Sequence, residues 1–227
     1  MTDKMRSARA VVFDAYGTLF DFGSPAQRLS DVLGDRWRTL ADLWRAKQLQ
    51  YTWLRSLQGR HADFWQVTGE ALEFALSSLG VDDAGVRQRL LELYERLDAH
   101  PDARDALARL RGGGLRLAIL SNGSPRMLEA AARSAGIAEF LDLVLSVEEV
   151  GIYKPHPSVY QLAVDRLGLP ADGIAFVSAN GWDAYSAKAF GLSVAWCNRS
   201  GQPAERIPSP PDAEIRSLSE LPPLLGR

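Results

Sequence analysis

The sequence predicts an α/β fold, a doubly wound parallel sheet with a helical cap inserted after the first strand. From residue 102 onward, short apolar runs alternate with amphipathic stretches of helical length, as they do in βαβ units. Before that point, residues 24–100 show helical periodicity and no convincing strand. We therefore expect a Rossmann-like core domain at 1–20 and 101–227 and a helical cap domain at 21–100.

The first predicted strand is the apolar run 10–13, which ends in Asp14 and is followed by the turn residue Gly17. Four apolar residues bounded by a turn signal are typical of a buried strand. Ligands bind at the carboxyl ends of parallel strands, so Asp14 is expected to face a crevice. An aspartate after a strand is also a common turn residue, and its role therefore depends on partners elsewhere in the chain.

Three amphipathic sets fill the predicted cap. The first includes Leu40 and Trp44 and reaches Leu57, the second begins at Phe64 and ends at the C-cap glycine Gly80, and the third covers 86–97. Beyond the cap, strands are predicted at 115–120, 141–146, 174–177, 192–196 and 213–218. Helices are predicted at 102–110, 124–135 and 157–167, with a last one closed by Gly191.

Polar residues follow several of the predicted strands. They are Asp14, Ser121 with Asn122, Lys154, and the acid-bearing segment 178–183. Because parallel strands place their carboxyl ends on one edge of the sheet, these residues are expected to converge on a single crevice.

Composition favours a small-molecule partner. The chain has 227 residues, of which 46% are hydrophobic, and a formal net charge of -2. This balance gives no electrostatic footprint for nucleic acid or for an anionic membrane. Cys197 is the only cysteine, no apolar run approaches the length of a membrane span, and residues 1–9 are polar. We therefore expect a cytoplasmic protein.

The order of these residues resembles the haloacid dehalogenase superfamily. The shared features are Asp14 and Thr18 after the first strand, a Ser-Asn pair after the next, a lysine before a proline, and an acid in a later loop. Longer strings are similar to the L-2-haloacid dehalogenases across about residues 11–196. These strings are WR at 44–45, KQL at 47–49, YTWLRSL at 51–57, DFW at 63–65, SNG at 121–123, YKP at 153–155 and NGWDA at 180–184.

The resemblance implies hydrolytic dehalogenation of short-chain L-2-haloalkanoic acids to 2-hydroxy acids, with inversion, through an ester on Asp14. A carboxylate can attack the carbon that bears the halogen, and water then cleaves the ester. The implied catalytic residues are Asp14, Thr18, Arg45, Lys154, Ser178, Asn180 and Asp183. In this scheme Arg45 receives the halide, and Asp183 activates water with Asn180. Taken alone, Arg45 would be a solvated helix charge, and only the surrounding match favours the halide role.

The implied substrate contacts are Tyr16, Arg45, Leu49, Phe64, Ser121, Asn122, Tyr160 and Trp182. Backbone N–H groups of Ser121 and Asn122, beside a helix start, offer a site for the substrate carboxylate. Tyr16, Leu49, Phe64 and Trp182 are expected to exclude water, although aromatic residues at helical spacing, such as Phe64, are more often core. Tyr160 matches a family residue near Lys154. The family is typically homodimeric, so a homodimer is expected.

Two positions depart from the phosphatases of that superfamily. Tyr16 stands where a phosphatase has a second acid to protonate its leaving group, and Ser178 opens the last loop. A halide leaves as a stable anion and needs no proton, while Asp14 and Asp183 alone make a poor Mg²⁺ site. No metal or cofactor is therefore expected. The alternatives are a Mg²⁺-dependent small-molecule phosphatase and a non-catalytic member that binds carboxylates.

Overall fold

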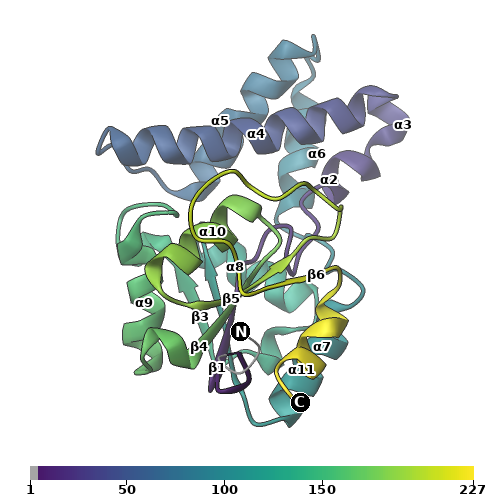
Figure 1. Ribbon diagram of the computed structural model, residues 1–227. Helices are drawn as coiled ribbons and strands as arrows, with labels where there is room; N and C mark the ends of the chain where they lie inside the picture. Colours follow the sequence, from purple (N-terminus) through teal and green to yellow (C-terminus); the bar gives the residue numbers. More distant parts are fainter. Residues whose placement is uncertain (1–4) are drawn as a thin grey trace.

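The computed structural model describes residues 5–227 and contains a six-stranded sheet in which all paired strands are parallel (Figure 1). The strands lie in the order β3-β2-β1-β4-β5-β6. They are β1 (Ala10–Phe13), β2 (Arg116–Ser121), β3 (Leu143–Ser146), β4 (Ile174–Ser178), β5 (Ser193–Cys197) and β6 (Ala213–Ile215). The predicted α/β fold with a parallel sheet is thus confirmed. Residues 1–4 of the predicted core lie outside the described residues.

The central strands are apolar along their length because both faces of the sheet are covered. Every residue of β1, β4 and β5 is buried. Helices α7 (Ala103–Gly112) and α9 (Pro157–Leu167) lie on opposite sides of the sheet in Figure 1. The remaining long core helices are α8 (Pro125–Ser134), which packs on β3, and α10 (Gly181–Phe190), which packs on β4 and β5.

Strand β1 stands where the strand order reverses. The chain adds β2 and β3 on one side of β1 and then returns to add β4, β5 and β6 on the other. Phe13 is in register with Ile119 of β2 and with Val177 of β4. Side chains that follow β1 and β4 therefore meet at a topological switch point, where open α/β sheets bind their ligands.

Five helices between β1 and α7 lie together beyond one end of the sheet (Figure 1). They are α2 (Ser24–Arg28), α3 (Ser30–Leu33), α4 (Arg36–Leu57), α5 (Phe64–Ser78) and α6 (Ala84–Tyr94). We call this group the cap, and its division from the core at 21–100 stays a proposal. Asp63 and Asp83 begin α5 and α6 by accepting hydrogen bonds from first-turn N–H groups.

The two connections between the cap and the core run side by side. Phe20 and Ala99 form an antiparallel bridge, the Asp21 N–H donates to the Asp98 carbonyl at 2.9 Å, and the His100 N–H donates to the Leu19 carbonyl at 2.8 Å. The chain therefore enters and leaves the cap at one place, a few residues beyond β1.

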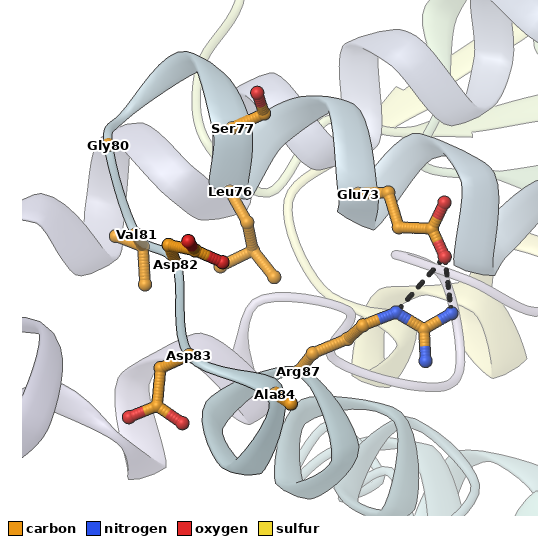
Figure 2. Close-up of a pocket in the computed structure, with 9 residues that line it drawn as sticks. All are labelled: Glu73, Leu76, Ser77, Gly80, Val81, Asp82, Asp83, Ala84 and Arg87. Carbon is orange, nitrogen blue, oxygen red and sulfur yellow. Dashed lines mark hydrogen bonds and ion pairs between the residues drawn. The ribbon is translucent and has the colours of Figure 1, made fainter.

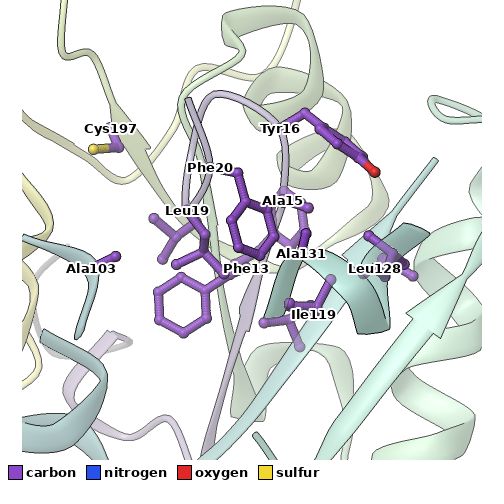
Figure 3. Packing of buried hydrophobic residues seen from close by; sticks show 14 of the residues in the cluster. Phe13, Ala15, Tyr16, Leu19, Phe20, Ala103, Ile119, Leu128, Ala131 and Cys197 are labelled. Atoms are coloured by element: carbon purple, nitrogen blue, oxygen red, sulfur yellow. The ribbon is translucent and has the colours of Figure 1, made fainter. Parts of the chain in front are cut away.

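A continuous cluster of buried apolar residues joins the sheet to the cap. Figure 3 shows its central part, where Phe13, Leu19 and Phe20 lie near Ile119. The same cluster extends to Trp44, Phe64 and Leu72 in the cap. Full burial of a leucine or phenylalanine side chain contributes roughly 1.5–3 kcal/mol, so this cluster fixes the cap against the sheet.

Several predicted boundaries shift by a few residues. The strand predicted from 141 begins at Leu143, because the preceding residues form the 3₁₀ turn Ala138–Phe140. The strand predicted to 218 ends at Ile215, because Ser217 and Glu220 form a capping box that starts a new turn. Ser124 occupies the N-cap position of α8, but its side chain makes no capping hydrogen bond. No helix within residues 5–227 is both long and apolar enough to cross a membrane.

Candidate active site

Asp14 stands directly after β1 and is 6% exposed. Its N–H donates to the Val177 carbonyl at 2.9 Å, so the ladder between β1 and β4 fixes its backbone. The chain then turns sharply at Gly17, whose φ of 91° is a conformation that side-chain-bearing residues rarely adopt. A Cβ at Gly17 would also lie 3.3 Å from the Phe22 ring. The strand and the turn together hold the carboxylate at the switch point.

The two carboxylate oxygens of Asp14 are unequally bound. Oδ2 accepts hydrogen bonds from Asn180 Nδ2 at 2.7 Å, Thr18 Oγ1 at 3.1 Å and, more weakly, Ser178 Oγ at 3.4 Å. Oδ1 accepts one bond from Lys154 Nζ at 3.1 Å. Because a carboxylate offers about four lone-pair sites, Oδ1 retains the greater capacity to react.

Lys154 lies between two carboxylates. Its Nζ is 3.1 Å from Asp14 Oδ1 and 2.8 Å from Asp183 Oδ2, and the side chain is 1% exposed. Burial alone would lower the pKa of Lys154, but the charges of Asp14 and Asp183 outweigh it and raise that pKa. The lysine is therefore a stable cation that holds both acids in place.

Asp183 is fully buried on the first turn of α10. Burial raises its pKa above the ordinary value, and the charge of Lys154 opposes that rise. Tyr160 donates its hydroxyl to Asp183 Oδ1 at 2.7 Å and is itself fully buried. The hydroxyl of Tyr160 is thus occupied by Asp183, because a buried phenol needs a hydrogen-bond partner, and the predicted substrate contact of Tyr160 stays a prediction.

The loops after β1 and β4 are cross-linked. Thr18 Oγ1 donates to Asp14 and accepts the Ala179 N–H at 2.8 Å, and the Asn180 N–H donates to Ser178 Oγ at 3.1 Å. Asn180 is the N-cap residue of α10, and its Nδ2 also donates to the Tyr16 carbonyl at 3.1 Å. Side chains far apart in sequence thus form one hydrogen-bonded group around Asp14.

Arg45 reaches this group from α4 in the cap. Its Nη2 donates to Asn180 Oδ1 at 3.3 Å, and its Nη1 donates to Gln48 Oε1 at 2.8 Å. The Phe22 ring centroid is 5.0 Å from the guanidinium carbon, and the buried Nε atom has no hydrogen-bond partner. Within residues 5–227, Arg45 forms no ion pair with a carboxylate. Its charge is therefore uncompensated.

Aromatic rings surround the Tyr16 side chain. Its centroid lies 5.6 Å from those of Phe64 and Tyr94. A Cβ at Gly123 would come within 2.9 Å of the Tyr16 hydroxyl oxygen, so this glycine lets the ring lie against the loop after β2. Trp182 packs edge-on against Trp53 of α4 at 5.4 Å. These contacts give the site apolar walls on both the core and the cap sides.

Ser121 and Asn122 have structural partners beside the site. Ser121 Oγ accepts the Gly123 N–H at 3.1 Å, and Asn122 Oδ1 accepts the backbone N–H of Lys154 at 3.0 Å. The loop after β2 is thereby tied to the residue that pairs with Asp14. Leu49 is half-buried one turn beyond Arg45 on α4, and its substrate contact stays a prediction.

Sequence reasoning missed several residues of this arrangement. Gln48 contacts Arg45 directly, and its place three residues along the same helix was a usable signal. Arg199 donates to the Thr18 carbonyl at 2.9 Å and forms a bidentate ion pair with Asp102 at 2.8 and 2.9 Å. No motif in the sequence connects position 199 with position 18.

A separate surface cavity of about 480 Å³ lies between α5 and α6 (Figure 2). Asp82 and Asp83 line it, and its Glu73 is neutralised by Arg87 at 2.6 Å. None of the residues around Asp14 lines this cavity. The buried charges of Lys154 and Asp183 and the unpaired Arg45 Nε instead lie together at the sheet edge.

Comparison with known proteins identifies similar chains. Residues 8–191 match the family model described as haloacid dehalogenase-like hydrolase. The chain is 46% identical to (S)-2-haloacid dehalogenase 1 of Pseudomonas sp. (strain CBS-3), covering 98% of this chain and 99% of that protein. It is 45% identical to (S)-2-haloacid dehalogenase 4A of Burkholderia cepacia, covering 97% and 96%. The structure of the Xanthobacter autotrophicus L-2-haloacid dehalogenase with chloropropionic acid covalently bound superposes with a TM-score of 0.90, at 39% identity, covering 96% of this chain and 98% of that one.

Proposed function

The chain belongs to the haloacid dehalogenase-like hydrolases, and we propose that it converts short-chain L-2-haloalkanoic acids to 2-hydroxy acids. One observation carries this proposal. A buried carboxylate with one lightly bound oxygen, Asp14 Oδ1, shares Asn180 as a hydrogen-bond partner with Arg45, a cation that has no carboxylate partner within residues 5–227. A nucleophile and an anion acceptor on one site are the two parts that displacement of a halide needs.

In the first step, Asp14 Oδ1 attacks the substrate carbon that bears the halogen. A C–O bond forms, the carbon–halogen bond breaks, and its electron pair leaves with the halide toward Arg45. The result is an ester on Asp14, and a single displacement inverts the carbon. Lys154 favours this step because it holds the Asp14 carboxylate in place without blocking every lone pair on Oδ1.

In the second step, water attacks the ester carbonyl carbon of Asp14, and Asp183 accepts a proton from that water. The raised pKa of Asp183 suits this role, since it makes the carboxylate a stronger base. Negative charge then develops on Oδ2, which faces the donors of Asn180, Thr18 and Ser178. These donors form an oxyanion hole. The tetrahedral intermediate collapses, and Oδ1 departs with the substrate carbon and takes the proton that Asp183 accepted, which gives the 2-hydroxy acid. The regenerated Asp14 carboxyl group then releases the second proton of the water to solvent.

Binding of the substrate carboxylate is assigned to the backbone N–H groups at Ser121 and Asn122. Their loop lies against Tyr16 and is tied to Lys154, so the substrate carbon would be held near Asp14. Phe64 and Trp182 add apolar walls that limit water around the alkyl group. We assign Tyr160 to positioning Asp183 rather than to binding substrate.

The proposed reaction needs no metal. A phosphatase of this superfamily uses Mg²⁺ between its carboxylates, whereas here the Lys154 ammonium lies between Asp14 and Asp183 and offsets one of their two negative charges. Tyr16 cannot act as the second acid that a phosphatase needs. A cytoplasmic location stays a prediction.

The test is halide release from the two enantiomers of 2-chloropropionate. We expect release from the L-enantiomer, persisting in EDTA, and none from the D-enantiomer. A strict requirement for Mg²⁺, or turnover of phosphate esters in its place, would favour the phosphatase alternative. Binding of haloacid without turnover would favour a non-catalytic carboxylate-binding protein.

Isotope labelling tests the ester. In a single turnover in H₂¹⁸O, the label should enter Asp14 and be absent from the product, because the product hydroxyl oxygen comes from Oδ1. Label in the product of the first turnover would instead show direct attack by water on the substrate.

We also propose that the protein is a homodimer built on the cap. Leu54 and Leu57, three residues apart on α4, are 44% and 85% exposed, and Phe74 of the adjacent helix α5 is 40% exposed. Exposed apolar residues that are close together are typical of protein interfaces. Sedimentation should give twice the monomer mass, and Leu57→Arg should shift the protein toward monomer. A monomeric wild type would contradict this proposal.

A further inference from the structure

The cap contains a chain of buried polar side chains that the proposed steps do not use. Gln48 is 1% exposed and Thr68 is fully buried, on the facing helices α4 and α5. Burial of an amide or a hydroxyl is unfavourable unless the group is hydrogen-bonded. Apolar side chains at these two positions would avoid that cost, so the arrangement of the polar pair matters.

The hydrogen bonds of Thr68 set the direction in which the Gln48 amide points. Thr68 Oγ1 donates its single proton to the Phe64 carbonyl at 2.7 Å, so it must accept from Gln48 Nε2 at 2.8 Å. Gln48 Nε2 also donates to the Tyr94 hydroxyl at 3.1 Å, and that hydroxyl donates more weakly to Gln48 Oε1 at 3.4 Å. With its amide nitrogen committed to these two partners, Gln48 turns its Oε1 toward Arg45 Nη1 at 2.8 Å.

This direction fixes a side chain that is otherwise flexible. The guanidinium of Arg45 is held by Gln48 at Nη1 and by Asn180 at Nη2, and Phe22 covers one face. Both hydrogen-bond partners are neutral, so they orient the group without cancelling its charge. The buried Nε has no partner, which leaves donor capacity for an anion.

We infer that Gln48, anchored by Thr68 and Tyr94, is a positioning residue that aims the Arg45 guanidinium at the departing halide. The inference rests on the proposed function, because it takes Arg45 as the group that receives the halide. The Tyr94 ring also stacks on Tyr16 at 5.6 Å, which connects this chain to the loop after Asp14.

The position of Arg45 should affect the two steps of the proposed reaction differently. Chloride is a poorer leaving group than bromide, so its displacement depends more on hydrogen-bond donors that stabilise the departing charge. A misaimed Arg45 should therefore slow displacement of chloride more than displacement of bromide. Hydrolysis of the ester should not change, because the halide has left by then.

The experiment measures single-turnover ester formation and ester hydrolysis with L-2-chloropropionate and L-2-bromopropionate. In Gln48→Met, the bromide-to-chloride ratio of ester-formation rates should rise about 10-fold over wild type, while hydrolysis of the ester stays within about 2-fold. Thr68→Val should raise the ratio by about 3-fold, because Gln48 then keeps only Tyr94 as an anchor.

The matched control is Thr52→Val. Thr52 is also a buried cap threonine, and its hydroxyl donates only to the Leu49 carbonyl at 2.7 Å among the described residues. Its removal should leave the halide ratio unchanged. If Gln48→Met fails to fold, Tyr94→Phe carries the test, since it keeps the packed ring and removes only the hydroxyl; its ratio should rise by about 2-fold.

Three outcomes would overturn the inference: an unchanged halide ratio in every variant, an equal loss with both halides, or a loss confined to ester hydrolysis. Failure of the proposed function is distinguishable, because wild type would then release neither halide. A crystal structure of Gln48→Met tests the positioning independently of turnover. The Arg45 guanidinium should move by about 1 Å or more from its wild-type place, and an unmoved guanidinium would contradict the inference.

Discussion

The core and cap halves of the site hold their charges in different ways. On the core side, the Lys154 ammonium lies between the carboxylates of Asp14 and Asp183, so both carboxylates are ion-paired and the group has one negative charge left over. On the cap side, Arg45 has only the neutral partners Gln48 and Asn180. The core carboxylate is also fixed by a strand ladder, whereas the cap cation depends on side chains of a helix.

This difference assigns complementary roles. A carboxylate that is to act as a nucleophile must be oriented before substrate arrives, and the ion pair with Lys154 holds Asp14 in place. A cation that is to receive a leaving group must keep its charge available until that group departs. In the proposed reaction, the paired half therefore serves attack, and the unpaired half serves departure.

Asp14→Asn should have the largest effect, because it removes the nucleophile while it keeps the shape of the side chain. Halide release should fall by at least ~10⁴-fold, as for loss of the nucleophile in other covalent enzymes. Halide assays on the folded variant, checked by circular dichroism, measure the loss. Residual release within about 100-fold of wild type would show that attack does not need Asp14.

Lys154→Met tests the paired half directly, because it leaves two buried carboxylates without their cation. The free energy of unfolding at neutral pH should fall by about 3–5 kcal/mol, and halide release by about 10³-fold. The pKa of Asp183 is already raised by burial, and loss of Lys154 would raise it further. A carboxyl group whose pKa is raised in the folded state lowers the free energy of unfolding of the protein as pH rises. Urea unfolding should therefore show the variant regaining stability as pH is lowered. Stability that instead increases with pH would contradict the pairing.

Arg45→Lys tests the unpaired half. Lysine keeps the positive charge but lacks the planar fork that contacts Gln48 and Asn180 together. Ester formation should slow by about 10²-fold, more with chloride than with bromide, while hydrolysis of the ester is unchanged. Arg38→Lys, on the same helix with its guanidinium over the Trp37 ring, is the control and should leave both rates unaltered. Equal slowing of both steps would remove the distinction between the halves.

Asp102→Asn should have the smallest effect and shows what a paired carboxylate outside the site contributes. Although burial opposes it, hydrogen bonds from Arg199 and Ser217 lower the pKa of Asp102 to about 2. The stability that the protein gains from this lowered pKa is fully present above the ordinary pKa of an aspartate, and it is lost as pH falls toward about 2. The variant should lose about 1–2 kcal/mol in urea unfolding at neutral pH, and the difference from wild type should shrink as the solution is acidified. A constant difference across that range would contradict the low pKa.

Much of the core could be predicted because its elements carry local signals. The strand at Ala10–Phe13 and the helix at Pro157–Leu167 have the predicted bounds, since apolar runs, Pro157 and Gly168 mark their limits. The short helices α2 and α3 have five and four residues, too few to show a period. Contacts such as Arg45 to Asn180 join residues 135 positions apart, and no local pattern encodes them.

Side-chain partners were the least predictable part of the site. The sequence indicates that Tyr160 and Asp183 belong to one region, but which oxygen a buried phenol reaches depends on the packing of α9 against α10. For the same reason Gln48 carried no separate signal beyond its place near Arg45. The hydrogen-bond partner of each polar side chain is decided by tertiary packing, whereas the presence of these side chains at the sheet edge follows from strand topology.

The adjacent connections at Phe20 and Ala99 make the cap an insertion whose two ends lie at one point. Because those ends are joined by hydrogen bonds, helices between them can lengthen, shorten or be exchanged without changing the register of β1. Arg45, the proposed halide acceptor, could therefore be replaced during evolution while Asp14 stayed in place. A chimera that joins another cap to this core would keep Asp14 and change the cap side chains that face it.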